Sequence, residues 1–201
     1  MAGLMLGIEL IFTGVEAGVL PRVFSRTHGF ALFAFFDPLF EHARRDGAVT
    51  LNLLWSFLTH AFVHGGWLHV ALNTAAFLGL GHAICSLSGL RAFFAIFAVS
   101  TICGALAFAL IADFRGPMVG ASGAVFGFLG AVTSWQEQGL RHSGQPRTEV
   151  WQRILGLIFI NALLDLGLGG MLAWEAHLGG FVGGWLTAYA FPPRAVRAAR
   201  A

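Results

Sequence analysis

Three groups of polar residues interrupt an otherwise apolar sequence where side chains could carry out nucleophilic chemistry. They are the histidine-bearing stretch 60–73, Gly-Ala-Ser-Gly at 120–123 and Ala-His-Leu-Gly-Gly at 176–180. A serine hydroxyl becomes a nucleophile when a neighbouring base takes its proton, and an imidazole that titrates near neutrality suits that task. Ser122 and His177 are therefore the candidate nucleophile and general base.

The same groups offer donors for the negative charge that acyl transfer develops on oxygen. We expect Ser122 to begin a helix, where backbone N–H groups lack partners and the helix dipole favours an anion. The side-chain amide of Asn73 and a suitably protonated His69 supply two further donors. The candidate oxyanion donors are therefore His69, Asn73 and the backbone N–H groups at the helix start that Ser122 forms.

The composition indicates that a membrane holds these groups. The chain is 57% hydrophobic and 11% charged, with a mean hydropathy of +0.74, whereas a soluble domain is nearer a quarter charged. The net charge is +2, and the arginines are scattered over loops, which argues against a nucleic-acid partner. The lipid bilayer is the expected surroundings.

Apolar runs long enough for a helix to cross a bilayer predict six transmembrane helices in one all-α domain, 1–201. They cover roughly 2–20, 61–86, 91–112, 121–136, 151–168 and 172–191. The second, fourth and sixth runs cross in the same direction, and each begins near one of the three polar groups. The polar groups should therefore lie at similar depth on one side of the membrane. The long connection 21–60 is expected to lie partly in the interface.

The arginines set the expected orientation. Positively charged loops stay in the cytoplasm, and arginines are more numerous on the side of the two termini. Those on that side are Arg91, Arg141, Arg147, Arg153, Arg194, Arg197 and Arg200; those opposite are Arg22, Arg26, Arg44, Arg45 and Arg115. Both termini, including the basic tail 192–201, are therefore expected in the cytoplasm. The first apolar run carries Glu9 and Glu16 and is expected to remain as a helix rather than be cleaved.

Glycine spacing predicts which helices pack closely. Gly123, Gly127 and Gly130 share a face of the fourth run, and the sixth run carries two small-xxx-small pairs, 179/183 and 180/184. Such spacing lets membrane helices pack backbone to backbone, which would bring Ser122 within reach of His177.

At these residues the chain resembles the rhomboid intramembrane serine proteases. The family patterns His-x3-His-x4-His-x3-Asn, Gly-x-Ser-Gly and Ala-His-x-Gly-Gly match three sets of residues. These are His60, His64, His69 and Asn73; Gly120 to Gly123; and Ala176 to Gly180. The match covers roughly 50–190 in consistent order and spacing.

The resemblance implies a six-helix rhomboid-like bundle and a Ser-His dyad without a third acid, a cofactor or a metal. It implies that Phe126 packs on the catalytic histidine, and that substrates are single-span membrane proteins cut in or near the bilayer. The chain departs from the family at Ser56, where an arginine often follows the tryptophan, and at Cys85, where many members have glutamate. The compact six-span form suggests a bacterial plasma membrane.

Several residues allow a second interpretation. His60 and His64 have metal-ligand spacing, but no further ligand completes a site, so we expect hydrogen-bonding roles near the helix start. Glu175 is two residues from His177 and on another helix face, so we expect it at the surface. Ser122 alone could be a small residue that permits helix packing. His82 is expected to pack inside the bundle, and Glu9, Glu16 and Asp165 to make polar contacts there.

Two other functions compete with proteolysis. A rhomboid-like protein could bind transmembrane helices without cutting them, although neither the serine nor the histidine is lost. A small channel or transporter could use the histidines as a proton path. That function predicts polar groups across the full bilayer depth, whereas here most of them cluster at one end, and internal repeats are not evident.

Overall fold

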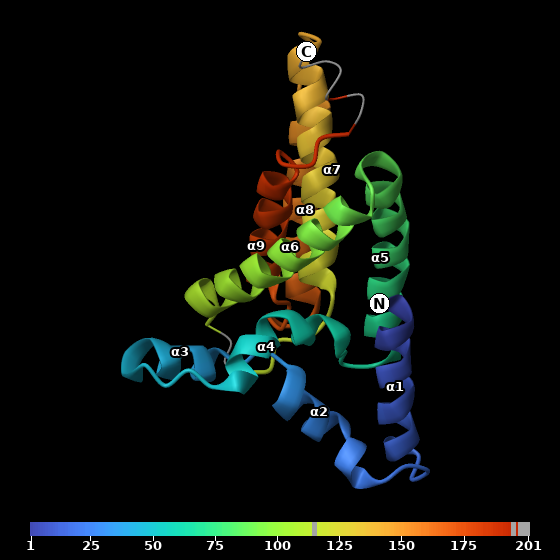
Figure 1. Cartoon of the computed structure of the whole chain (residues 1–201), viewed down its shortest axis with the longest axis vertical. Helices are drawn as coiled ribbons and strands as arrows, with labels where there is room; N and C mark the ends of the chain where they lie inside the picture. The colour runs from blue at the N-terminus through green and yellow to red at the C-terminus, as the bar shows by residue number, and fades with distance from the viewer. Residues whose placement is uncertain (114–115, 194–195, 197–201) are drawn as a thin grey trace.

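The computed structural model describes residues 1–113, 116–193 and 196, and within them the chain is helical, with one isolated β-bridge and no strand. Figure 1 shows the arrangement. The α-helices are α1 (Ala2–Glu16), α2 (Arg26–Phe33), α3 (Asp37–Asp46), α4 (Leu51–Thr59), α5 (Trp67–Ser88), α6 (Leu90–Ile111), α7 (Ser122–His142), α8 (Thr148–Gly167) and α9 (Trp174–Thr187). Two short 3-10 helices, η1 (Arg22–Phe24) and η2 (His60–Phe62), lie between them. The expected all-α class is confirmed.

A helix lies at each of the six expected membrane spans. Among the described residues, α5, α6 and α8 are long and apolar enough to cross a membrane. Helices α1 and α9, with 15 and 14 residues, are shorter. Helix α7 extends to His142 instead of ending near 136, and its last turns bury the polar side chains of Ser134, Glu137 and Gln138. Most of the expected basic tail, 192–201, lies outside the described residues, as does Arg115.

Local sequence signals set the ends of the helices within the connection 21–60. The side chains of Ser25 and Thr50 accept hydrogen bonds from the first turns of α2 and α4, as helix N-caps do. Gly47 ends α3 with a left-handed backbone, φ 70°, that glycine adopts without steric cost. Helices α2, α3 and α4 fill most of this connection and lie at the lower end of the molecule in Figure 1.

Helix α7 packs against α5, α6, α8 and α9, and glycines set its contact with α9. A Cβ added to Gly180 would collide with the carbonyl oxygen of Gly123, and one added to Gly184 with that of Gly127. The two backbones therefore touch, as the glycine spacing predicted. Helix α8 packs less closely than α7 and α9, since Val150 is its one fully buried residue.

The structure corrects two expectations about polar side chains. His82 is exposed on α5 instead of packed inside the bundle. Glu175 is buried, with 7% of its surface exposed, instead of lying at the surface. Both errors arise because a helical run does not by itself reveal which of its faces a neighbouring helix covers.

Candidate active site

The three polar groups lie at the starts of three helices. His69 and Asn73 are one turn apart near the start of α5, Ser122 is the first residue of α7, and His177 lies in the first turn of α9. Side chains at the starts of α7 and α9 approach one another because of the glycine contact between the two helices. The sequence therefore predicted correctly which helix ends carry the candidate groups.

Gly120 brings the backbone before Ser122 against the expected oxyanion donors. Its φ of +110° is a conformation that side-chain-bearing residues rarely adopt. A Cβ there would lie 2.6 Å from Nε2 of His69 and 3.8 Å from Nδ2 of Asn73. The Gly120 N–H donates to the carbonyl oxygen of His60 at 2.9 Å. Both donors therefore lie beside the turn that leads into Ser122.

His60 and His64 make the hydrogen bonds expected of them. Nδ1 of His60 donates to the carbonyl oxygen of Ser56 at 2.8 Å. Nε2 of His64 accepts from the N–H of Ala121 at 3.4 Å. Burial lowers the pKa of His60 to about 4 and that of His64 to about 3, so both imidazoles are neutral near pH 7. His64, in the loop between η2 and α5, thus tethers the residue that precedes Ser122.

His177 lies flat on Phe126. The ring centroids are 4.3 Å apart and the ring planes differ by 5°, the stacking that the family resemblance implied. Phe126 is one turn after Ser122 on α7, so the imidazole is held beside the first turn of that helix. In the part of the chain that the structure describes, no hydrogen bond joins Ser122 to His177. Instead, Nδ1 of His177 pairs with Oδ1 of Asn161 on α8 at 2.6 Å.

Asn161 is a site residue that sequence reasoning missed. The signal for it was present, since an amide inside an apolar run is costly and usually has a partner. It escaped notice because α8 carries none of the three polar groups, and its neighbours along the run are apolar.

A pocket of about 600 Å³ lies beside this pair. Side chains of α7, α8 and α9 line it, and apart from Asn161, Asp165 and His177 they are apolar or aromatic. Asp165 also accepts a hydrogen bond from the Leu172 N–H at 3.2 Å, so its polar contact lies in the loop between α8 and α9 and not inside the bundle as expected. The pocket can therefore receive an apolar segment next to the candidate base.

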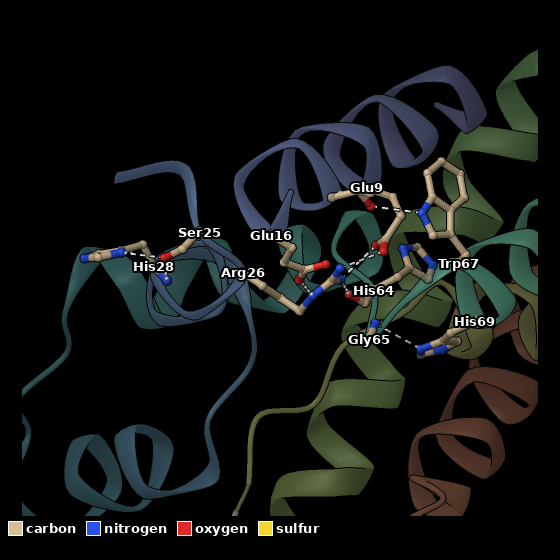
Figure 2. A network of polar contacts seen from close by, with 10 residues as sticks. Glu9, Glu16, Ser25, Arg26, His28, His64, Gly65, Trp67 and His69 are labelled. Atoms are coloured by element: carbon tan, nitrogen blue, oxygen red, sulfur yellow. Dashed lines mark hydrogen bonds and ion pairs between the residues drawn. The ribbon is translucent and has the colours of Figure 1, made fainter. Parts of the chain in front are cut away.

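Glu9 and Glu16 both pair with one arginine, Arg26, at the start of α2. Its guanidinium binds both carboxylate oxygens of Glu9, at 2.8 and 2.9 Å, and one oxygen of Glu16 at 2.9 Å. It also donates to the carbonyl oxygen of His64 at 2.7 Å. Figure 2 shows Arg26 reaching from α2 to both glutamates of α1 and to this loop. The two carboxylates raise the pKa of Arg26, which stays charged.

The structure shows what surrounds Ser56 and Cys85, the two departures from the family pattern. Ser56 is buried, and its hydroxyl donates to the carbonyl oxygen of Leu53 at 2.8 Å. Cys85 is a half-buried free thiol in α5. No group of three or more His, Cys, Asp or Glu side chains within the described ranges could hold a metal ion.

Comparison with known proteins places these residues in a family context. The family model described as Rhomboid domain matches residues 52–194. "Rhomboid protease GluP" of Bacillus subtilis is 29% identical over 152 residues, which are 74% of this chain and 28% of that protein. An uncharacterized protein of Mycobacterium tuberculosis is 31% identical over 160 residues, 72% of this chain and 63% of that protein. "RHOMBOID-like protein 1" of Arabidopsis thaliana is 32% identical over 139 residues, 69% of this chain and 34% of that protein. The chain thus spans less than two thirds of each of these relatives.

Proposed function

Because this chain belongs to the Rhomboid family, we propose that it is a serine endopeptidase that cuts single-span membrane proteins in or near the bilayer. Ser122 is the nucleophile and His177 the general base. The observation that carries the proposal is the stacking of His177 on Phe126, one turn into the helix that Ser122 begins. A base held at the start of a helix whose first residue is serine suits acyl transfer.

The reaction uses the groups of the chain itself and water. Oγ of Ser122 attacks the substrate carbonyl carbon while its proton passes to Nε2 of His177. His177 then protonates the leaving amine, which departs and leaves an acyl-enzyme. Water attacks the ester, its proton passes to His177, and Ser122 recovers that proton as the acid leaves. Hydrogen bonds at a catalytic base often tighten only when substrate binds.

The groups around Gly120 support the oxyanion assignment. Donation by Asn73, His69 and the Ser122 N–H would stabilise the tetrahedral intermediate. Gly120 and Gly123 admit the close approach of backbone and side chains that this arrangement needs. His60 and His64 hold the adjoining backbone through the hydrogen bonds described above.

The apolar pocket and the arginine distribution indicate the kind of substrate and the orientation in the membrane. The apolar pocket beside His177 supports a transmembrane segment as substrate. The excess of arginine on the side of the termini favours cytoplasmic ends, and we assign the chain, as one rhomboid-like domain, to a bacterial plasma membrane. The proposed reaction involves no metal, cofactor or nucleic acid.

A fluorophosphonate probe tests the proposal. It phosphonylates a serine only when a base activates the hydroxyl, so the purified protein should be labelled at Ser122, as mapped by peptide mass spectrometry. Ser122→Ala and His177→Ala should each abolish labelling while retaining the helical circular dichroism of the unmodified protein.

Labelling that survives His177→Ala at an undiminished rate would remove the base assignment. A folded protein that is not labelled at all would favour a rhomboid-like protein that binds transmembrane helices without cutting them.

A further inference from the structure

Asn161 on α8 reaches across the pocket to the imidazole of His177. Oδ1 of Asn161 lies 2.6 Å from Nδ1 of His177. The two residues are sixteen positions apart and belong to different helices, α8 and α9. This hydrogen bond is therefore a product of helix packing and not of local chain geometry.

A second hydrogen bond determines which amide atom faces the histidine. Nδ2 of Asn161 donates to the carbonyl oxygen of Leu157, one turn earlier on α8, at 2.8 Å. A carbonyl oxygen can only accept, so the atom paired with Leu157 is the NH2 group and the atom facing His177 is the oxygen. The Asn161 oxygen in turn accepts, so Nδ1 of His177 carries its proton and Nε2 is the free lone pair.

We propose that Asn161 is a positioning residue for the Ser122–His177 pair and holds His177 in the Nδ1–H tautomer. The inference rests on the proposed protease function. Phe126 fixes the plane of the imidazole by stacking, and Asn161 fixes its rotation within that plane. Together they leave Nε2 available to take the proton of Ser122.

The surroundings explain why an amide serves here and not a carboxylate. The His177–Asn161 pair lies beside a pocket lined mainly by apolar side chains. A carboxylate would carry a charge in this setting, and burying an unpaired charge is far more costly than burying an amide that makes hydrogen bonds. An amide oxygen accepts the Nδ1–H bond as a carboxylate oxygen would, and it adds no charge beside His177.

A purely structural role is the competing explanation. Helix α8 buries one residue fully, so the Asn161–His177 bond could simply fasten α8 to α9. The two roles differ in what they control. A hydrogen bond that only joins α8 to α9 affects stability, whereas a positioning residue sets the tautomer of His177 and the pH at which that base becomes protonated.

The variants Asn161→Leu and Asn161→Asp separate these roles. Leucine keeps the approximate size and removes the acceptor, while aspartate keeps the acceptor and adds a charge. Thr187→Val is the matched control, because it removes a comparable bond, from Oγ1 to the Gly183 carbonyl at 2.7 Å, on the helix that carries His177.

The readout is the rate of Ser122 phosphonylation by a fluorophosphonate, with fluoride as leaving group, followed across pH and probe concentration. We expect Asn161→Leu to lower the maximal rate about 10- to 100-fold, the factor for a hydrogen bond to a group that becomes charged, with little change in half-saturation. Asn161→Asp should retain more of the rate and move its acid limb to higher pH, because a carboxylate favours imidazolium. Thr187→Val should behave as the unmodified protein.

Nitrogen-15 spectra of labelled histidine give a readout independent of activity, with His177→Gln assigning the signal. The unmodified protein should show a protonated Nδ1 on His177, and Asn161→Leu should shift the tautomer balance. Unchanged rates, acid limbs and tautomer in both Asn161 variants of an active protein would overturn this inference alone. An unmodified protein that is never labelled at Ser122 would instead overturn the proposed function.

Discussion

At the residue scale, the Asn73 side-chain amide has one hydrogen-bond partner in the structure and a second one in the proposed reaction. Its Nδ2 now donates to the carbonyl oxygen of His69, one turn earlier on α5, at 3.0 Å. The same nitrogen lies beside Gly120, at the turn leading into Ser122. In the proposed reaction this amide donates a hydrogen bond that stabilises the oxyanion.

Replacing Asn73 with alanine should therefore slow Ser122 labelling about 100- to 1,000-fold, the usual cost of one oxyanion donor. Stopped-time labelling with a fluorophosphonate measures the rate. Asn52→Ala is the matched control, because the Asn52 amide also donates to a backbone carbonyl, that of Ala31 at 2.8 Å, far along the chain from Ser122. Equal rates in the two variants would remove Asn73 from the oxyanion hole.

The contact between α7 and α9 decides the site at the element scale. Because the two backbones touch at Gly180 and Gly123, and again at Gly184 and Gly127, the start of α9 is fixed against the start of α7. Any side chain introduced between them must push the helices apart, since the neighbouring atoms are backbone and cannot rotate away. The distance between Ser122 and His177 would change with it.

Gly184→Ala should destabilise the protein by about 1–3 kcal/mol, as overpacking of a core does, and should also reduce labelling of Ser122. Gly156→Ala on α8 is the control, because an added Cβ there meets nothing within 4 Å. Alanine in an exposed helix position is favoured over glycine by about 0.5–1 kcal/mol, so this variant should be equally or slightly more stable. Thermal unfolding in detergent measures both variants, and a Gly184→Ala midpoint equal to that of the control would contradict the packing argument.

At the scale of the whole molecule, Arg26 connects the N-terminal helices to the site. It links α1 and α2 to the loop carrying His64, whose ring accepts from the N–H of Ala121, next to Ser122. Glu9 is 1% exposed, so its charge depends on this arginine for compensation. This chain has Ser56 after Trp55, and the guanidinium that reaches the loop carrying His64 comes from Arg26 on α2.

Arg26→Ala should cost about 3–5 kcal/mol, because it leaves the carboxylate of Glu9 buried without its partner. Arg44→Ala is the control, since its ion pair with Glu41 at 3.2 Å is exposed and such pairs contribute at most about 1 kcal/mol. The double variant Glu9→Gln/Arg26→Gln should recover part of the loss, because it removes both charges. Unfolding midpoints of the two arginine variants that coincide would show that Arg26 is not needed for stability.

The sequence by itself determined the helical membrane class, the position of each long helix and the grouping of candidate residues at helix starts. These properties depend on the local length of apolar runs and on glycine and polar spacing along one helix. The close approach of α7 and α9 also followed from sequence, because small residues at four-residue spacing leave one face of a helix without side chains. Such signals need no knowledge of the partner helix.

Only the tertiary structure decided which polar side chains meet across elements. The rotation of helices against one another decides several features. These are the pairing of Asn161 with His177, the hydrogen bonds of Arg26 to Glu9 and the His64 carbonyl, the burial of Glu175 and the exposure of His82. A hydrogen bond requires its atoms to lie within about 3 Å, whereas the apolar pattern fixes a helix face only to within a broad stripe. The sequence therefore indicated the candidate chemistry, and the packing of α8 and α2 determined which further side chains contact the candidate site.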